Sequence, residues 1–206
     1  MGLEYARQLA AEDCGLALVS NRPEELAAAA ATLSSEFGVK VITLDIDLCA
    51  PGAAGKVLEW CDEEGVAPDI LINNAGMFFM HYLGPENLAK ASAMVDLHVK
   101  AVTELCVLFG ARMKESGAGR ILNVASMTAW IPAPGIAVYS ASKAYLVSFG
   151  KAFHMNCGPT GSRSQPSARR QSIPGSMALV NGSAGGCVVS AFFAALNGWC
   201  EGPFGV

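Results

Sequence analysis

Asp69-Ile-Leu-Ile-Asn-Asn-Ala-Gly76 is an apolar run of strand length that ends in two amides and a glycine. A second run of this kind, Gly119-Arg-Ile-Leu-Asn-Val-Ala-Ser126, ends in a serine. Short continuous apolar runs of this length are typical of strands that are buried on both faces. Both runs deliver polar groups at their carboxyl ends, which is where open α/β sheets bind ligands. The two runs therefore predict a parallel sheet with a ligand site at the carboxyl ends of its strands.

A tyrosine and a lysine four residues apart follow in Tyr139-Ser-Ala-Ser-Lys143. On a helix, side chains with this spacing lie one above the other on the same face. An ammonium beside a phenol favours the phenolate, so the pair suits a phenol that donates a proton. The hydroxyl of Ser126 would hold a substrate carbonyl or hydroxyl during the transfer. A Tyr-x-x-x-Lys pair alone is common, but after these two strands it indicates an acid/base site for alcohol and carbonyl chemistry.

Together these motifs resemble those of the short-chain dehydrogenase/reductase family. They are Asn73-Asn74-Ala75-Gly76, the serine of Asn123-Val-Ala-Ser126, and Tyr139-x-x-x-Lys143, with Ser126 standing 13 positions before Tyr139 (139 − 126) as in that family. The resemblance runs from Gly2 to about Gly161. It implies a Rossmann-type fold, a nicotinamide cofactor, and hydride transfer between that cofactor and a small alcohol or carbonyl substrate.

The resemblance also assigns roles to single residues. Tyr139 would protonate the substrate oxygen, Lys143 would stabilise the phenolate and bind the cofactor ribose, and Ser126 would orient the substrate. The Asn74-Ala75-Gly76 segment would line the nicotinamide-side ribose, where the glycine allows a close approach. The alternative for this segment is a role in the turn alone.

The residues that follow two further strand candidates bear on the choice of cofactor. Ser20-Asn21-Arg22 contains no carboxylate, and a carboxylate there would hold the ribose hydroxyls of NAD and repel the extra phosphate of NADP. Arg22 would instead meet that phosphate, which favours NADP over NAD, and a solvated arginine near a helix start is the alternative. Asp47-Leu48 resembles the family's adenine-contacting pair. Asp45 competes with Asp47, which we favour because Leu48-Cys-Ala-Pro51 then leads into the next helix.

The family usually carries an asparagine in its long helix, where it supports a water that links to the lysine. Counting about 24 residues on from Asn74 reaches His98 (98 − 74). A histidine can donate or accept a hydrogen bond there, but its charge would titrate near neutrality. His98 is therefore a candidate catalytic residue in a proton relay, with a structural hydrogen bonder as the alternative. Phe78, Phe79 and Tyr82 are candidates for a substrate wall or for core packing.

Strand and helix patterns alternate along the chain, which predicts a Rossmann-like, doubly wound parallel α/β sheet. The expected strands are residues 16–20, 39–44, 70–73 and 120–124. The expected helices are residues 3–12, 23–37, 51–64, 85–116 and 139–155.

Both ends of the chain depart from the family pattern. Gly2 matches the last glycine of the family's glycine-rich turn, so the first strand of the family is missing, and its place between strands 16–20 and 70–73 is expected to be empty. The sheet would then be incomplete and would expose two strand edges. We divide the chain into a partial core at 1–160 and an atypical tail at 161–206, disordered or translated out of frame. A linker before a helix at about 186–196 is the alternative for this tail.

Composition narrows the class of protein. A content of 52% hydrophobic and 16% charged residues suits one domain whose sheet is covered by helices on both faces. A net charge of −4 argues against a nucleic-acid partner. The seven cysteines and three histidines show no Cys-x-x-Cys or zinc-like grouping, so we expect no metal site and a reducing compartment. No signal peptide or membrane-length apolar run is visible, so we expect a cytoplasmic protein without a membrane partner.

Two hypotheses for the function follow. The first is an oxidoreductase of the short-chain type that uses NADP. The second is a truncated, inactive fragment or a non-catalytic interaction remnant of such an enzyme. From the resemblance alone we also expect a homodimer that forms through the helices at 85–116 and 139–155.

Overall fold

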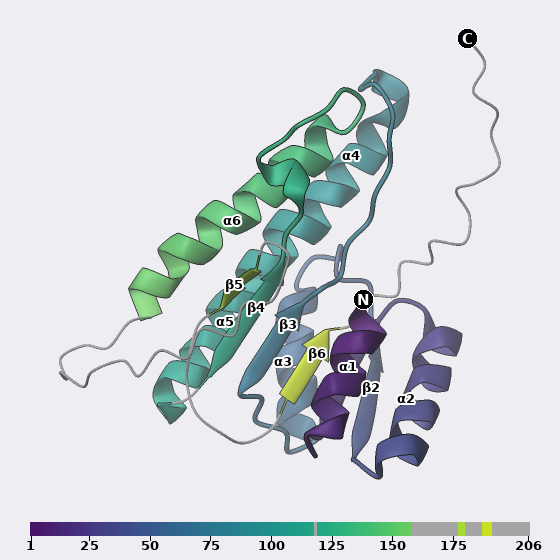
Figure 1. The fold of residues 1–206 in the computed structure, drawn as a ribbon, viewed down its shortest axis with the longest axis vertical. Coiled ribbons are helices and arrows are strands. Elements are labelled where there is room, and N and C mark those ends of the chain that lie inside the picture. The colour runs from purple at the N-terminus through teal and green to yellow at the C-terminus, as the bar shows by residue number, and fades with distance from the viewer. Residues whose placement is uncertain (118, 158–176, 180–186, 191–206) are drawn as a thin grey trace.

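The protein folds around a six-stranded sheet, shown by a computed structural model that describes residues 1–117, 119–157, 177–179 and 187–190. The strands lie in the order β2-β1-β6-β3-β4-β5 (Figure 1). All neighbouring strands are parallel except β5, which runs antiparallel to β4 at one edge. The strands are β1 (Leu16–Ser20), β2 (Val41–Asp45), β3 (Ile70–Asn73), β4 (Arg120–Val124), β5 (Met177–Leu179) and β6 (Cys187–Ser190).

Helices connect the strands, and each predicted helix is present within a few residues of its expected limits. The long expected helix at 85–116 is a continuous run of three segments after a short helical turn. The helices are α1 (Gly2–Ala11), α2 (Pro23–Phe37), α3 (Ala53–Glu63), α4 (Leu88–Val95), α5 (Val102–Ser116) and α6 (Ala137–Cys157). The short turns are η1 (Pro85–Asn87), η2 (Asp96–Ala101), which is π-helical, and η3 (Met127–Ala129).

Local sequence explains where the helices begin and end. Pro23 opens α2, where its fixed backbone angle fits the first turn and its missing N–H costs nothing. Gly38 ends α2 with a φ of 70°, and Gly117 ends α5 with a φ of 73°. Both angles lie in the left-handed region that glycine adopts without steric cost. The helix limits are therefore set by residues visible in the sequence.

The two faces of the sheet are covered by different helices. On one face, alternate strand residues such as Ala17, Val19 and Leu71 pack in one core with residues of α3, α5 and α6. On the other face, Leu18 and Ile72 pack with α1 and α2. Buried strand residues thus point alternately to both faces, which explains why the strands read as continuous apolar runs. The arrangement confirms the α/β prediction.

A strand from the C-terminal part of the chain lies in the middle of the sheet. In β6, Cys187 pairs with Leu16 of β1 on one side and with Ile70 of β3 on the other, and Ser190 lies opposite Asn73. In Figure 1, α1 begins near the arrowhead of this yellow strand. The expectation of an empty central position with two exposed edges is therefore wrong.

The tail also differs from the alternative that was expected for it. Residues Cys187–Ser190 form a strand rather than part of a helix. The sequence did not predict this strand, because four residues inside a glycine- and serine-rich segment are too few to show the hydrophobic periodicity of a strand. Most of the predicted tail, including 191–196, lies outside the described residues.

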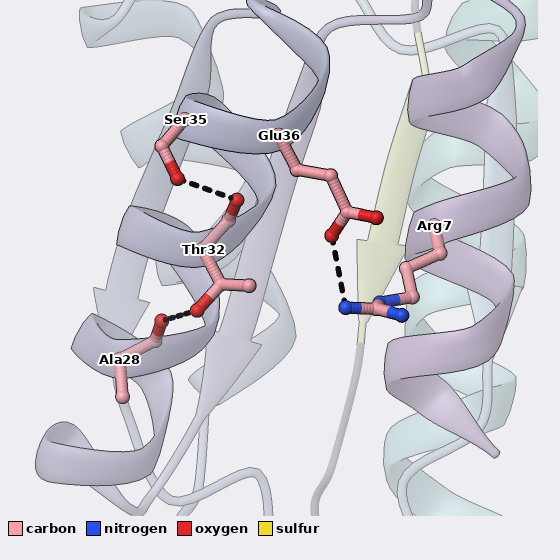
Figure 2. A network of polar contacts seen from close by, with 5 residues as sticks. All are labelled: Arg7, Ala28, Thr32, Ser35 and Glu36. Atoms are coloured by element: carbon pink, nitrogen blue, oxygen red, sulfur yellow. Dashed lines mark hydrogen bonds and ion pairs between the residues drawn. The ribbon is translucent and has the colours of Figure 1, made fainter.

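One exposed ion pair joins α1 to α2. Figure 2 shows Arg7 of α1 reaching Glu36 of α2, with 2.9 Å between Nη2 and Oε2. Beside it, Thr32 and Ser35 bond back to carbonyl oxygens of their own helix, Thr32 Oγ1 to Ala28 O at 2.8 Å and Ser35 Oγ to Thr32 O at 3.0 Å. An exposed pair contributes only about 0.2–1 kcal/mol. The apolar contacts beneath it therefore hold the two helices together.

None of the helices in the described part of the chain is long and apolar enough to cross a membrane.

Candidate active site

The carboxyl ends of β3 and β4 are tied together by a buried amide pair. Asn73 and Asn123 lie opposite each other in the parallel pairing, and Asn73 Nδ2 donates to Asn123 Oδ1 at 2.8 Å. The same nitrogen lies 3.3 Å from the Sγ of Cys106 on α5. Both asparagines are buried, so this bond fixes the two strands where the loops of the site leave them. The sequence showed both amides at strand ends, but the role of Asn123 as the partner of Asn73 was missed.

Tyr139 and Lys143 lie on the first turns of α6, as predicted. The ammonium nitrogen of Lys143 is 5.7 Å from the centre of the Tyr139 ring. It also donates a hydrogen bond of 2.8 Å to the carbonyl oxygen of Val124, the last residue of β4. The Lys143 side chain is buried, and because burial disfavours the charged form, its pKa falls to about 8. The structure thus places a buried lysine beside the phenol at the end of a strand.

Two aromatic rings hold the Tyr139 ring on its other sides. Phe78 meets it edge to face, with ring centres 4.9 Å apart, and His98 does so at 5.8 Å. Such edge-to-face pairs restrict the orientation of a ring. Tyr139 is half-buried, so its ring is fixed while part of the residue stays open to solvent. This is the arrangement expected of a side chain that acts on a ligand.

Ser126 caps the short helical turn η3, two residues after β4 ends. Its Oγ accepts hydrogen bonds from the Thr128 N–H at 3.3 Å and from Thr128 Oγ1 at 3.1 Å. A hydroxyl that accepts from two donors still has its own proton to donate. The residue is half-buried. Thr128, which the sequence analysis did not single out, is therefore the residue that orients the predicted substrate-binding hydroxyl.

His98 lies in the π-helical turn η2, between α4 and α5, and is buried. Its Nε2 accepts a hydrogen bond of 2.9 Å from the Met77 N–H, and its Nδ1 is 2.8 Å from Ser142 Oγ on α6. Burial, followed by the charge of Lys143, lowers the pKa of His98 to about 3. Its pKa thus lies far below the near-neutral value expected from the sequence alone.

The Asn74-Ala75-Gly76 segment leads from β3 toward His98. Ala75 is buried, and Asn74 and Gly76 are half-buried. A Cβ atom on Gly76 would lie 3.0 Å from His98 Nε2. A side chain here would be tightly placed against the imidazole, a contact that the sequence alone could not show.

The predicted adenosine-side residues lie at the carboxyl ends of β1 and β2. Arg22 is paired with Glu25 at 2.8 Å, and its backbone N–H donates to Ser20 Oγ at 3.2 Å. Asp47 is exposed, and its Oδ1 accepts from the Cys49 N–H at 2.9 Å. Leu48 is buried in the core. The structure thus places these residues at one end of the sheet. Arg22 and Asp47 bond to residues near them in the chain, and Leu48 packs in the core.

Apolar side chains surround the opening next to Tyr139. The loops at 74–84 and 125–136 flank it and are joined by a hydrogen bond of 2.9 Å from the His81 N–H to Gly135 O. Phe79 is buried with Ala91 and Met94, whereas Phe78 and Tyr82 are exposed. The predicted aromatic cluster therefore divides between core packing and the rim of the site. A shallow hollow beside Tyr139 is lined by Phe79, His81, Leu83 and Gly135–Tyr139.

Within the described residues, no three His, Cys, Asp or Glu side chains come together in a way that would hold a metal ion. Cys49 and Cys61 have thiols whose pKa burial raises to about 11, which keeps them protonated and unreactive. Of the predicted catalytic residues, Tyr139 lies beside both Lys143 and His98, and Ser126 follows the end of β4.

Known proteins match this chain in sequence. The family model for short chain dehydrogenase matches residues 1–164. A very-long-chain 3-oxoacyl-CoA reductase of Danio rerio is 29% identical over 160 residues, which is 73% of this chain and 48% of that protein. One from Coprinopsis cinerea is 30% identical over 159 residues, 74% of this chain and 45% of that protein. The chain thus spans about half the length of the curated relatives it matches.

Solved structures match the fold. A short-chain dehydrogenase from Sphingobium yanoikuyae in complex with NADPH superposes with a TM-score of 0.68 and 29% identity, over 74% of this chain and 60% of that one. The bulky-bulky ketone specific alcohol dehydrogenase from Comamonas testosteroni superposes with a TM-score of 0.69 and 26% identity, over 76% and 63%. Both likenesses rest on three quarters of this chain.

Proposed function

Because the chain belongs to the short-chain dehydrogenase family, we propose that it transfers a hydride between NADP and an uncharged, bulky alcohol or ketone, with Tyr139 as the proton donor. The observation that carries this proposal is the placement of Lys143. Its ammonium is buried, lies beside the Tyr139 ring and is anchored to the Val124 carbonyl. Burying an ammonium is costly unless it makes compensating interactions, so a buried lysine at this position indicates a functional role.

The residues of this site fit the nicotinamide side of the cofactor. Lys143 has three N–H donors and uses one on Val124, which leaves two for ribose hydroxyls. Gly76 has no side chain in the loop proposed to line the ribose, so the backbone there is open to a close approach. When bound, the nicotinamide would supply the hydride, and the protein would supply position and electrostatics.

The chain's own groups would handle the proton. Ser126 would donate its free hydroxyl proton as a hydrogen bond to the substrate oxygen, and Tyr139 would transfer its phenolic proton to that oxygen as negative charge develops. The Lys143 ammonium would stabilise the phenolate that remains. Its electrostatic effect is strong because the site is partly shielded from water. Oxidation of an alcohol would use the same groups in reverse.

The preference for NADP rests on Arg22. No carboxylate follows β1 in the segment Ser20–Arg22, so nothing there would repel a 2′-phosphate. Arg22 is engaged with Glu25, but this pair is exposed, with 38% and 44% of the two side chains accessible. Separating such a pair costs only about 0.2–1 kcal/mol, which a phosphate contact would outweigh. The NADPH complex of the Sphingobium yanoikuyae relative supports this choice.

The rim of the site favours an uncharged, bulky substrate. Between residues 70 and 85, and between 121 and 142, the sequence contains no Asp, Glu, Lys or Arg. In the described part of the chain, seven of the eleven exposed large apolar side chains lie on the two flanking loops. These are Phe78, Met80, Tyr82, Leu83, Met127, Trp130 and Ile131. A polar or charged substrate would find few partners here. The activity of the Comamonas testosteroni relative on bulky-bulky ketones is in keeping with this.

The test is an assay of ketone reduction by product formation, with NADPH or NADH and with an apolar aryl ketone or its carboxylated analogue. We expect the apolar ketone with NADPH to be the best pair. Trp130→Ser should raise the KM for the ketone several-fold, while Val107→Ser, an exposed apolar residue on α5, should not. Equal activity on the carboxylated ketone would contradict the substrate class. A thermal melt that NADPH does not shift, together with no turnover, would instead support the non-catalytic hypothesis.

A further inference from the structure

We propose that His98 is a positioning residue that fastens the Asn74–Met77 loop to the catalytic helix α6, and that it carries no proton during the reaction. The kinetic part of this inference rests on the proposed function. The bonding state of the imidazole does not, and it is tested separately below.

His98 is positioned by a local change in the helix. The segment Asp96–Ala101 is π-helical, whereas α4 before it and α5 after it are regular. A π-helical turn widens the helix by one residue and is frequent at functional sites. Here the wider turn holds an imidazole that is only 1% exposed. The imidazole therefore lies where η2, the loop after β3 and α6 meet.

Hydrogen bonds fix the tautomer of the ring. Ser142 Oγ donates its proton to the Tyr139 carbonyl oxygen at 2.8 Å, so toward His98 it acts as an acceptor. The 2.8 Å contact between Nδ1 and Ser142 Oγ must then be an Nδ1–H donor bond. On the other side, the Met77 N–H donates to Nε2 at 2.9 Å, so Nε2 carries no proton. Both nitrogens are engaged, and the ring is the neutral Nδ1–H form.

The surroundings oppose a second proton. A proton on Nε2 would point at the Met77 N–H, which is itself a donor. The titratable groups that face the ring, Tyr139 and Lys143, both belong to α6, and the positive charge of Lys143 disfavours an imidazolium. A proton relay needs a group that gains and loses protons readily near the working pH. The groups around His98 therefore keep the imidazole neutral and prevent it from exchanging protons near the working pH.

The same hydrogen bonds give His98 a positioning role in place of a proton relay. Through Met77 it holds the loop that follows Asn74-Ala75-Gly76, and a Cβ atom at Gly76 would lie tightly against Nε2, at 3.0 Å. Through Ser142 it holds the residue next to Lys143 on α6. The imidazole thus sets the distance between the loop proposed to bind the ribose and the helix that carries the acid.

The direct test is ¹⁵N NMR of the protein labelled at its three histidines. His98→Gln assigns the His98 signals, and His154→Gln, at an exposed site on α6, is the matched control. We expect the ¹⁵N shifts of His98 to show an Nδ1–H, unprotonated Nε2 ring that stays constant between about pH 5 and pH 9. A protonation step within that window, or the Nε2–H tautomer, would overturn the proposal. The shifts are measured on the wild-type protein without substrate, and if His98→Gln does not fold, His81→Gln and His154→Gln assign the His98 signals by elimination.

Kinetics of two variants tests the positioning. His98→Leu removes both hydrogen bonds, and we expect roughly a ten- to hundredfold loss in kcat/KM together with weaker NADPH binding. His98→Gln keeps an acceptor and a donor in a side chain that cannot titrate. It should recover most of the loss, with the pH–rate profile of the wild type. A relay predicts the opposite, which is that Gln is as poor as Leu and that the pH–rate profile changes shape.

Discussion

The two ends of the proposed cofactor groove are built in different ways. At the β3–β4 end, the polar groups are buried and bonded to groups on other elements: Asn73 to Asn123, Lys143 to Val124, and His98 to Met77. At the β1–β2 end, Arg22 and Asp47 are more accessible and are bonded to residues within three positions of themselves. The first arrangement fixes groups in space, whereas the second leaves side chains free to move.

The difference matches what each end would do in the proposed reaction. Proton donation requires fixed geometry and low exposure to water, because electrostatic stabilisation is strongest from prearranged groups. Recognition of a ribose or its phosphate tolerates side chains that adjust on binding. Substitutions at the first end should therefore have large effects on both rate and stability, and those at the second end small effects on selectivity.

The largest effect short of removing the acid itself should come from Lys143→Met. This change removes the charge that stabilises the phenolate and the bond to the Val124 carbonyl. We expect kcat/KM to fall by about a hundredfold or more, within the range for a group that assists proton transfer. Steady-state kinetics with NADPH measures it, and Lys151→Met on the exposed end of α6 is the control.

A loss of stability should follow Asn123→Ala. This change leaves the Asn73 amide nitrogen, buried between the strands, with the weak Cys106 sulfur acceptor. The unsatisfied donor should lower the free energy of unfolding by about 1–3 kcal/mol. Urea denaturation reports this, and Asn123→Leu combined with Asn73→Leu should recover part of the loss. No change in the midpoint would show that the amide pair does not hold the strands.

His98 should also make stability depend on pH. The pKa of His98 is about 3 in the folded protein and near 6.5 in the unfolded chain. Between these two pH values the unfolded chain therefore binds a proton on His98 that the folded protein does not bind. Stability should therefore fall as pH decreases from about 6.5 toward 3, by up to about 1.4 kcal/mol per pH unit. His98→Gln should flatten this slope when urea midpoints are compared across pH, whereas His154→Gln should not.

A small effect is expected at the other end of the groove. Arg22→Ala should reduce the preference for NADPH over NADH by roughly tenfold, with little change in kcat, because one phosphate contact would be lost. Cofactor titration gives both affinities. An unchanged ratio would place the phosphate elsewhere and remove the support for NADP.

The smallest effect should be that of Arg7→Ala, which breaks the exposed link between α1 and α2 (Figure 2). We expect a change of less than about 1 kcal/mol in the free energy of unfolding. A larger loss in thermal or urea denaturation would mean that this pair, rather than the apolar contacts, joins the helices.

The sequence predicted the regular elements well because their signals are local. Continuous apolar runs marked β1, β3 and β4, and Pro23 marked the start of α2. The four-residue strand β6 could not be predicted, since its place depends on pairing with residues more than a hundred positions away. Such long-range pairing leaves no pattern in four residues.

The candidate site residues could be identified from the sequence, but the hydrogen bonds that they make could not. Tyr139, Lys143 and Ser126 follow from their spacing, and the structure brings the first two together. The neutral state of His98 depends on Met77 and Ser142, which lie far apart in the sequence and carry no mark of this role. The close approach of position 76 to the His98 imidazole is likewise invisible in the sequence.

The most direct test of the account is Tyr139→Phe beside Tyr145→Phe, a tyrosine on the same helix whose hydroxyl bonds to Thr103 instead. NADPH affinity and the single-turnover rate with an apolar ketone should be measured for each. The account predicts that Tyr139→Phe slows turnover by about a hundred- to ten-thousandfold while NADPH binds almost as in the wild type. Tyr145→Phe should retain turnover close to that of the wild type. Turnover at the wild-type rate in Tyr139→Phe would contradict the central claim that this phenol donates the proton.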